Sequence, residues 1–488
     1  MNGIIILMPM LVPIVGTLFL AARTVKNQNT IKRIVASSVL VNALFVIFIN
    51  FYMDVSDIHL LKVNNFLDIY FKVDRLGVLF STMASFLWIL TSWYAFGYMA
   101  GKPRLKQFYV FFTVTLAVVM GIAYSGNLFT LYAFYELLTL ATLPLVMYNG
   151  NEQALSSGKK YMIYSFTGAT FILFGMMLLY SVTGDMSFVP LGLTRTVQLN
   201  NSNILLISYI SMFVGFGVKA ALVPFHTWLP AAMVAPTPVS ALLHAVAVVK
   251  SGVFSIIRIT YFIFGAASVR YFEASKYLIP LVVVTVVMGS FLALHQDHLK
   301  KRLAYSTISQ LGYMLLGILL LNPDGLRGSI LHLVNHAMIK ITLFFIVGAI
   351  TMQTHKKHIH EIYGIGKAMP LSMMCFSIAA ISLVGIPPTN GFVSKWFLGL
   401  GALTSSNLFF ILILLISALL TAGYLIPIIV AAFFSSHRED LIFSDSINLD
   451  PPKTMMVPIL IITGIVILLG LFPNPLMNFI DGVIVDAF

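Results

Sequence analysis

The segment KAALVPFHTWLPAAMVAPTPVSALLHAVAVVKSGVF, residues 219–254, is apolar in most positions but carries Lys219 at its start and Lys250 near its end. Pro224 and further prolines interrupt it. A lysine inside a membrane costs free energy, and a proline removes a backbone hydrogen bond that lipid cannot replace. We therefore expect the middle of this segment to face protein or water, and the rest of the chain is interpreted from it.

The composition indicates a membrane protein. Of the 488 residues, 59% are hydrophobic and 9% charged, with a mean hydropathy of +0.95, which exceeds what a soluble core needs. Apolar runs long enough to cross a bilayer predict an all-α polytopic protein with about fourteen transmembrane helices. The predicted helices lie near residues 3–22, 34–53, 76–99, 108–125, 127–148, 160–182, 203–224, 239–264, 277–296, 303–321, 327–353, 371–387, 407–434 and 455–474.

Two of these predicted helices are interrupted in a similar way. The seventh breaks at Pro224, and the twelfth breaks at Pro387 and Pro388 in VGIPPTNGF. The two breaks are five helices apart. Because this spacing is odd, the units around them would be inverted in the membrane, as in transporters built from inverted repeats. Two unrelated proline kinks are the simpler alternative.

The basic residues predict an orientation. Of the 29 Lys and Arg residues, 17 fall in loops on one side of the predicted topology and 7 on the other. The positive-inside rule makes the first set cytoplasmic, including the loops near 23–33, 102–106, 300–302 and 356–367, and puts both termini outside. The net charge of +12 is therefore explained by topology, and nucleic acid is not an expected partner.

Little in the sequence points to a cofactor. The single cysteine, Cys375, excludes an iron–sulfur cluster or a zinc site built from several cysteines within this chain. A glycine-rich phosphate loop after a strand is also missing from the sequence, so we expect no nucleotide hydrolysis, no cofactor and no metal.

Several charged residues lie within apolar spans of the sequence. The cations are Lys219, Lys250, Arg258, Lys340 and Lys395, and the one central carboxylate is Glu136. Arg258 is near a helix end, where its side chain is expected to reach the interface. Lys219 is the natural partner of Glu136, as a proton-handling pair or as a purely structural salt bridge. Because one glutamate cannot pair with four lysines, some lysines must be neutral part of the time, which suits a proton relay.

Histidines extend this set. HLVNHAMIK puts His332, His336 and Lys340 along one stripe of the eleventh helix. Two histidines four residues apart could bind a metal, but no carboxylate or thiol accompanies them. A structural histidine pair and a proton wire are the alternatives. His244 precedes Lys250 by an offset of about 240°, so the two share a face only if the helix bulges between them.

The motifs resemble those of the antiporter-like membrane subunits of respiratory complex I, Mrp-type cation/proton antiporters and membrane-bound hydrogenases. The resemblance rests on residues 219–254, DHLKKRLAYSTISQLGYM at 297–314, HLVNHAMIKITLFF at 332–345 and GIPPTNGFVSKW at 385–396, and it covers at least residues 70–430. It implies two inverted five-helix repeats, helices four to eight and nine to thirteen.

This resemblance gives boundaries and roles. It implies three N-terminal helices in 1–106, a first repeat in 107–264, an inverted second repeat in 276–434, and a cytoplasmic loop with a last helix in 435–488. It matches Glu136 and Lys219 to the family's pair on the fifth and seventh helices. The remaining matched positions are Lys250 with His244, His336 with Lys340, and Lys395. Lysine at 395, where some complex I subunits have glutamate, makes the chain most similar to D subunits of Mrp antiporters.

Three functions compete at this stage. The first is a proton-translocating subunit of a larger complex: charge movement at Glu136 and Lys219 would shift the pKa of Lys250, and protons would then pass by His336 and Lys340 towards Lys395. The second is a sodium path through hydroxyl and carbonyl oxygens near the breaks, although lysines repel a bare cation. The third is a non-transporting scaffold. Redox centres would lie on other chains. The expected partners are other membrane subunits of an Mrp antiporter, hydrogenase or complex I-like translocase in a bacterial or archaeal cytoplasmic membrane.

Overall fold

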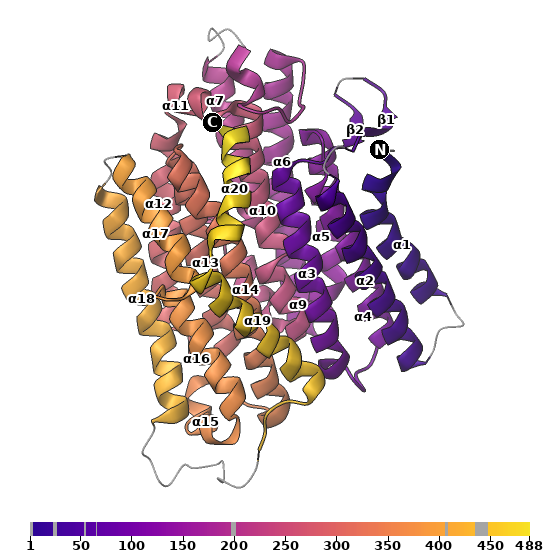
Figure 1. Cartoon of the computed structure of the whole chain (residues 1–488), viewed down its shortest axis with the longest axis vertical. Helices are drawn as coiled ribbons and strands as arrows, with labels where there is room; N and C mark the ends of the chain where they lie inside the picture. The colour runs from indigo at the N-terminus through magenta and orange to yellow at the C-terminus, as the bar shows by residue number, and fades with distance from the viewer. Residues whose placement is uncertain are drawn as a thin grey trace.

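The computed structural model describes residues 3–22, 27–52, 55–64, 66–196, 202–405, 408–434 and 448–488. In this part of the chain the protein is a bundle of helices, with the N-terminal helices on one side of the bundle and α12, α17 and α18 on the other (Figure 1). Asparagine side chains begin several of the long helices by capping them. Asn127, Asn151 and Asn322 each accept a hydrogen bond from the backbone N–H three residues later.

The first half of the chain supplies the following elements. They are η1 (Gly3–Leu7), α1 (Met8–Ala21), α2 (Gln28–Phe51), β1 (Ile58–Lys62), β2 (Asp68–Phe71), α3 (Arg75–Tyr98), α4 (Leu105–Ala123), α5 (Leu128–Val146), α6 (Glu152–Thr183), η2 (Leu193–Thr196), α7 (Ser202–Lys219), α8 (Trp228–Ala231), η4 (Ala232–Val234), α9 (Thr237–Ala245), α10 (Val248–Ile257), the π-helix η5 (Arg258–Phe264) and α11 (Ala266–Tyr271).

The second half is helical throughout its described part. Its elements are α12 (Ala274–Leu294), α13 (Leu299–Leu319), α14 (Pro323–Thr354), η6 (Ile359–Glu361), α15 (Ile365–Ala368), α16 (Pro370–Val384), α17 (Asn390–Thr404), α18 (Leu408–Phe433), α19 (Lys453–Leu471) and α20 (Asn474–Ala487).

Twelve spans among the described residues are long and apolar enough to cross a membrane. Each range predicted from the sequence overlaps a helix, although α13 is too polar and α16 too short to be counted among the twelve. The all-α polytopic membrane fold is therefore confirmed. The number fourteen, the inverted repeats and the four-part division stay predictions.

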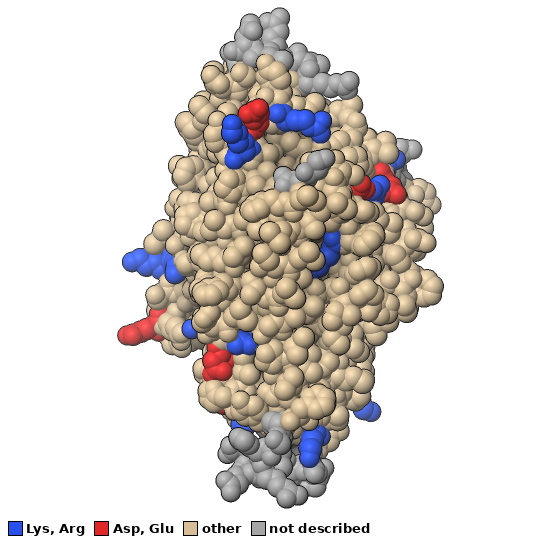
Figure 2. Space-filling model, turned by 90° about the vertical axis from the view of Figure 1, so that its left-hand side faces the viewer, with Lys and Arg blue, Asp and Glu red and all other residues tan. Residues whose placement is uncertain are grey.

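The outer surface fits contact with lipid. On α18, Leu408, Leu412, Leu415 and Leu419 recur at helical spacing, and all four are more than half exposed. The side of the molecule on which α18 lies carries few charged residues (Figure 2). A continuous apolar face of this size would drive aggregation in water, and in a bilayer it is simply solvated by acyl chains.

Two spans lie inside the bundle. The span Thr237–Phe264, made of α9, α10 and η5, is fully buried in its apolar core, and so is that of α14. Both spans carry lysine and histidine. Because other helices surround them, these polar side chains face protein on every side and are shielded from lipid.

The first predicted break is present in the structure. α7 ends at Lys219 and helix resumes only at Trp228, with Pro224 between them. A broken helix frees backbone carbonyls that lipid cannot satisfy. Here the indole Nε1 of Trp228 donates to the carbonyl of Val218 at 2.9 Å, so a side chain from beyond the break satisfies a group before it.

The second predicted break lies between α16 and α17 and contains Pro387 and Pro388. Its freed carbonyls are satisfied by a charged group. Lys395 Nζ donates to the carbonyl oxygens of Leu383 and Val384 at 2.7 and 2.9 Å. Lys395, one of the lysines within the apolar spans, therefore caps the C-terminal end of α16.

The eighth predicted helix also contains an irregularity, between α9 and α10. The N–H groups of Val246 and Ala247 both donate to the carbonyl of Leu242, each at 2.9 Å. This shared acceptor inserts an extra residue into the helical turn between His244 and Lys250. The bulge that these two residues needed in order to share a face is thus present.

Two elements were not expected from the sequence. An antiparallel hairpin, β1 with β2, lies in the connection between α2 and α3. The C-terminal helix α20 follows α19 and packs against α14 and α3. Salt bridges from Arg75 to Asp486, at 2.9 Å, and from Arg327 to Asp481, at 2.8 Å, attach it there.

The basic loops predicted to share one side of the membrane do meet at one end of the bundle. Lys102 follows α3, Lys300 begins α13 and Lys357 follows α14, and all three line a single cavity. The structure therefore supports the grouping of these loops. Which side of the cell membrane they occupy stays a prediction.

The orientation can be tested with cysteines introduced after Cys375 has been replaced by serine. We expect Asn29→Cys and Lys357→Cys to be protected from a membrane-impermeant maleimide in intact cells, because both positions lie in predicted cytoplasmic loops. Lys62→Cys, on the exposed hairpin, should react. Labelling of the first two positions together with protection of the third would show that the orientation is opposite to the predicted one.

Candidate functional site

Glu136 and Lys219, predicted as a pair, are brought together by α5 and α7. Lys219 Nζ lies 3.5 Å from Glu136 Oε1, and the lysine side chain is almost fully buried. The ammonium also donates to the backbone carbonyl of Tyr135 and lies 3.4 Å from the centroid of its ring. The separation exceeds the usual 2.7–2.9 Å of a charge-assisted hydrogen bond. Glu136 therefore holds Lys219 by charge, while Tyr135 positions it.

Lys250 lies on α10, which packs directly against the end of α7. A Cβ placed on Gly252 would be only 2.7 Å from the backbone nitrogen of Ala220, so no larger residue fits there. Lys250 itself is completely buried, and its Nζ lies 2.7 Å from Nδ1 of His336 on α14. The central lysine thus contacts a histidine from a helix far along the chain.

His332, one turn before His336, continues this arrangement. The ring centroids of the two histidines are 5.7 Å apart. His332 Nε2 lies 3.0 Å from Gln310 Oε1, and its Nδ1 lies 2.9 Å from the hydroxyl of Ser394. Because the Gln310 oxygen can only accept, a neutral His332 with this contact carries its proton on Nε2, and its Nδ1 faces the Ser394 hydroxyl. Ser394 is the neighbour of Lys395 in the sequence.

Lys395 joins the same group from α17. Its Nζ lies 5.2 Å from the ring centroid of Tyr313, and the Tyr313 and His332 rings are 5.8 Å apart. Ring contacts and the hydrogen bond of Lys250 thus connect Lys250, His336 and His332 with the neighbourhood of Lys395. We call the buried groups from Glu136 to Lys395 the row of buried groups, and its continuity from Lys219 to Lys250 stays a prediction. The row includes groups from both halves of the chain.

Lys340 and His244 border this row. Lys340 Nζ donates to the carbonyl of Leu303 at 3.0 Å and to the hydroxyl of Ser306, both on α13. Along α14, Lys340 lies one turn beyond His336, on the side away from His332. His332, and not Lys340, is the member of this stripe that lies near Lys395. The ring of His244 packs against Phe344 at 4.8 Å, and neither of its nitrogens has a hydrogen-bond partner among the described residues.

Arg258 differs from the sequence prediction. It was expected to reach the interface, but its side chain is completely buried and forms two hydrogen bonds with the carboxylate of Asp74, one of them 2.8 Å long. Asp74 also caps α3 by accepting from the N–H of Gly77 at 2.8 Å. The two residues are 184 positions apart, so helical periodicity gave no signal for the pair.

One group among the described residues has the composition and closeness to hold a metal ion, and the sequence analysis did not find it. Asp297, His358 and His360 offer ligand atoms that all lie within 4.8 Å of one another, on two exposed loops. Asp297 Oδ2 lies 3.0 Å from Nδ1 of His358 and 2.7 Å from Nδ1 of His360. Burial raises the pKa of the Asp297 carboxyl, but His360 and its neighbours bring it below the usual range.

Residues 125–421, which contain almost all of the row, match the family described as NADH:quinone oxidoreductase/Mrp antiporter, transmembrane. The chain belongs to this family. The match includes both breaks, and the recognition made from the sequence motifs is confirmed. The narrower resemblance to D subunits stays a prediction.

Curated relatives of this family member come from more than one kind of complex. NADH-quinone oxidoreductase subunit N of Desulforudis audaxviator is 33% identical over 417 residues, which cover 83% of this chain and 82% of the relative. Na(+)/H(+) antiporter subunit A1 of Staphylococcus aureus is 32% identical over 437 residues, again 83% of this chain. That alignment covers 53% of the antiporter subunit, so the chain spans about half of its length.

Solved structures share the fold of this family member over nearly its whole length. A chain of an archaeal membrane-bound sulfane sulfur reductase has a TM-score of 0.88 at 24% identity, covering 99% of this chain and 98% of its own. A chain of the Mrp complex from Dietzia sp. DQ12-45-1b has a TM-score of 0.85 at 22% identity, with 99% and 96% covered. A chain of respiratory complex I from Thermus thermophilus has a TM-score of 0.77 at 21% identity, with 96% and 98% covered.

The Asp74 and Arg258 pair gives a stability test. Asp74→Asn keeps a good cap for α3 but leaves the buried guanidinium without its counter-charge, so we expect a loss of about 3 kcal/mol of unfolding free energy. The double variant Asp74→Asn/Arg258→Met removes the buried charge and should recover most of that loss. Thermal unfolding of the purified protein measures both, and an equal loss in the double variant would show that the ion pair is not responsible.

Proposed function

We propose that this chain carries protons across the membrane along the row of buried groups, as one subunit of a larger complex. The observation that supports this most directly is the 2.7 Å contact between Lys250 and His336, made between the two fully buried spans. An amine and an imidazole are both able to take up and release a proton, and here they contact each other away from lipid.

The geometry suggests how the proton would move. With the proton on Lys250, its Nζ donates to Nδ1 of His336; transfer breaks that N–H bond and forms one on Nδ1. His336 then holds a proton on each nitrogen and can release the one on Nε2, a buried atom with no partner among the described residues. Both nitrogens of His332 already bond to Gln310 and Ser394, and His336 Nε2 has no partner among the described residues, so a water molecule would carry the proton towards His332.

The two ends of the row would have different tasks. At one end, Glu136 favours the protonated form of Lys219, so a change in their separation alters the charge felt at Lys250. At the other end, Lys395 is only partly buried and lies beside the second helix break. Lys340 and His244 would set the charge around Lys250 and His336 from the side.

The sodium alternative is less well supported by these contacts. Na⁺ would need carbonyl and hydroxyl oxygens free of other donors. The carbonyls of Leu383 and Val384 at the second break already accept from Lys395, and that of Val218 at the first break accepts from Trp228. One curated relative is named as a Na⁺/H⁺ antiporter subunit, so sodium dependence belongs in any test.

The scaffold alternative has to explain the cost of the buried lysines. A packing residue at position 250 would be apolar, because a fully buried amine is expensive and contributes little to stability. The relatives and the solved structures belong to complexes with several membrane subunits, which supports assembly of this chain into such a complex.

Coupling between Glu136 and Lys219 can be measured with a double-variant cycle. Glu136→Gln and Lys219→Met should each lower transport, because each leaves the other group without its partner. We expect the double variant to lose less than the two single losses combined, with a coupling of about 1 kcal/mol. Transport is measured as the pH gradient formed in everted membrane vesicles. Strictly additive effects would show that the two residues act independently and would contradict the pairing.

Lys250 is the position on which the proton row depends most. We expect Lys250→Met to assemble into its complex but to lose at least about tenfold of proton movement, because methionine cannot hold a proton. Lys250→Arg should also fail, since a guanidinium does not release its proton. The readout is pH-gradient formation after addition of the complex's electron donor or of Na⁺, with assembly checked by native electrophoresis.

A matched control comes from Lys276, which is exposed at the start of α12 and pairs only with Glu273. Lys276→Met should transport as the unchanged protein does. A normal gradient from assembled Lys250→Met would exclude the proton row and favour the scaffold. A gradient that depends on Na⁺ in every variant would favour the sodium path.

A further inference from the structure

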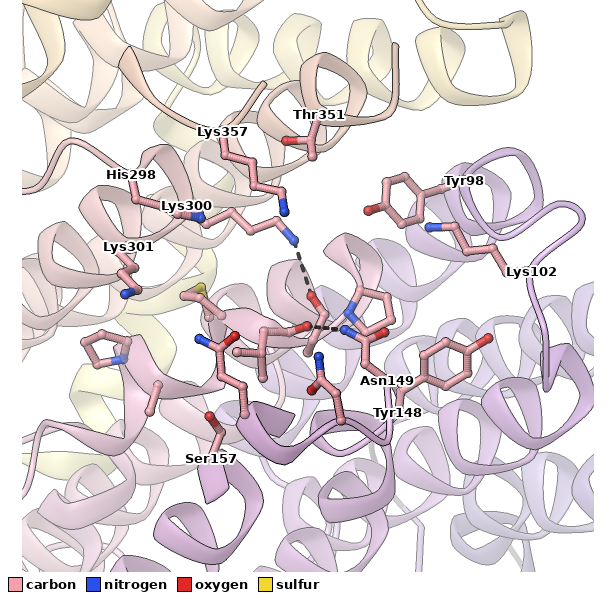
Figure 3. A pocket seen from close by; sticks show the side chains of 18 residues that line it. Tyr98, Lys102, Tyr148, Asn149, Ser157, His298, Lys300, Lys301, Thr351 and Lys357 are labelled. Atoms are coloured by element: carbon pink, nitrogen blue, oxygen red, sulfur yellow. Dashed lines mark hydrogen bonds between the residues drawn. The ribbon is translucent and has the colours of Figure 1, made fainter. Parts of the chain in front are cut away.

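A large cavity lies at the end of the bundle where the basic loops meet, apart from the row of buried groups. Its volume is about 740 Å³. Its walls come from distant parts of the chain: the loop after α3, the start of α6, the loop after α14 and the start of α13 (Figure 3). Residues 230–236, which follow the first helix break, form another wall.

The lining of this cavity is strongly basic. It includes Lys102, Lys300, Lys301 and Lys357, and none of the described residues that line it is acidic. Lys300 and Lys357 extend into the same space (Figure 3). Lys102 and Lys357 are also close enough to Lys300 to repel its charge. Like charges placed together in a partly enclosed space destabilise the protein unless an anion lies among them.

Lys300 is the residue that distinguishes this cavity from an ordinary solvated basic surface. Its side chain is only 9% exposed, and its Nζ donates to the carbonyl of Ala235 at 3.2 Å. An ammonium has three N–H groups, so two remain to be satisfied from the cavity. Scattered loop lysines of a positive-inside face are usually exposed, and burial of one among three others needs another reason.

Neighbouring groups are affected by the same positive field. Burial, together with the nearby His358, Lys301 and Lys300, lowers the pKa of His298 to about 4. Burial lowers the pKa of Lys102 to about 8. His298 is thus neutral near pH 7. Burial, together with the nearby Lys102 and Lys357, lowers the pKa of Lys300 to about 7, so an anion in the cavity would favour its charged form.

We infer that this cavity binds a phosphate-bearing anion, held by Lys300, Lys357 and Lys102. The amide of Asn149 and the hydroxyl of Ser157 lie in the same lining and supply neutral donors. Basic cavities between helices at the cytoplasmic end of membrane proteins are suited to the head groups of anionic phospholipids. A soluble phosphate offers the same chemistry, so lipid and free phosphate are two sources of one ligand group.

Occupation of the cavity would reach the first broken helix. Lys300, which begins α13, donates to Ala235, and Asn149, which follows α5, donates to the carbonyl of Val234 at 2.7 Å. The anion would therefore fix the segment after the break against two helices from different halves of the chain. Binding here stabilises the folded arrangement around that break.

The experiment uses the complex purified through an affinity tag on this chain and placed in nanodiscs of phosphatidylcholine. Inorganic phosphate is titrated in one arm, and part of the lipid is replaced by phosphatidylglycerol in the other. Binding to the folded state should raise the unfolding temperature of this chain by about 3 °C. Lys300→Gln and Lys357→Gln should each raise the half-saturating concentration about tenfold, because each removes a charge-assisted hydrogen bond.

Lys159→Gln is the matched control, since Lys159 is exposed on α6 and does not line the cavity. It should respond as the unchanged protein does. Without phosphate or anionic lipid, Lys300→Gln should unfold at the same or a higher temperature than the unchanged protein, because it removes a repelled charge. This separates loss of binding from loss of folding.

A response to both phosphate and phosphatidylglycerol would show that either source reaches the cavity, and a response to the lipid alone would assign a head-group site. Both results support the proposal if the two lysine variants weaken them. An equal response in those variants, or no response at all, would overturn it. An acidic segment of a partner subunit that already occupied the cavity would give no response at all, and this result too would overturn the proposal.

Discussion

In the hydrocarbon core of a membrane, every backbone group released from a helix and every charged side chain has to find its partner within the protein. This requirement connects the two unusual features of the chain, its broken helices and its buried lysines. At the second break, Lys395 supplies hydrogen bonds to the carbonyls of Leu383 and Val384. At the first break an indole does this for Val218, and Lys219 is released to face Glu136. At the second break the lysine and the freed carbonyls thus stabilise each other. At the first break the lysine does not bond to the freed Val218 carbonyl and pairs with Glu136 instead.

The sequence was sufficient for the features that depend on local chemistry. Apolar run length predicted the helices, prolines predicted both interruptions, and the His244 to Lys250 offset required the bulge found at Val246. The features it could not give depend on contacts between distant helices. Arg258 with Asp74, and Lys250 with His336, join residues 184 and 86 positions apart. The stripe of His332, His336 and Lys340 was correct on its own helix, but the neighbours on α13 and α17 decide which members of it are connected.

Environment gives the lysines of this chain different properties. In the cavity at the basic end, Lys300 and its neighbours surround a space that no carboxylate of the described residues lines. In the bundle centre, Lys250 has a histidine nitrogen and Lys340 has a carbonyl and a hydroxyl. An acceptor such as these stabilises an ammonium without cancelling its charge. The first environment therefore favours a bound anion, whereas the second favours an exchange of protons.

The balance of charge in the centre is consistent with that exchange. Within the described spans of the row, Glu136 is the one carboxylate, and Lys219 is the one lysine paired with it. Lys250, Lys340 and Lys395 contact only neutral acceptors among the described residues. Three full positive charges held this close in a medium of low dielectric constant would repel each other strongly. A proton arriving on one of these amines would therefore make it easier for a neighbouring amine to release its own. This repulsion acts equally in both directions, so the direction of transfer along the proposed row would come from the change in separation of Glu136 and Lys219.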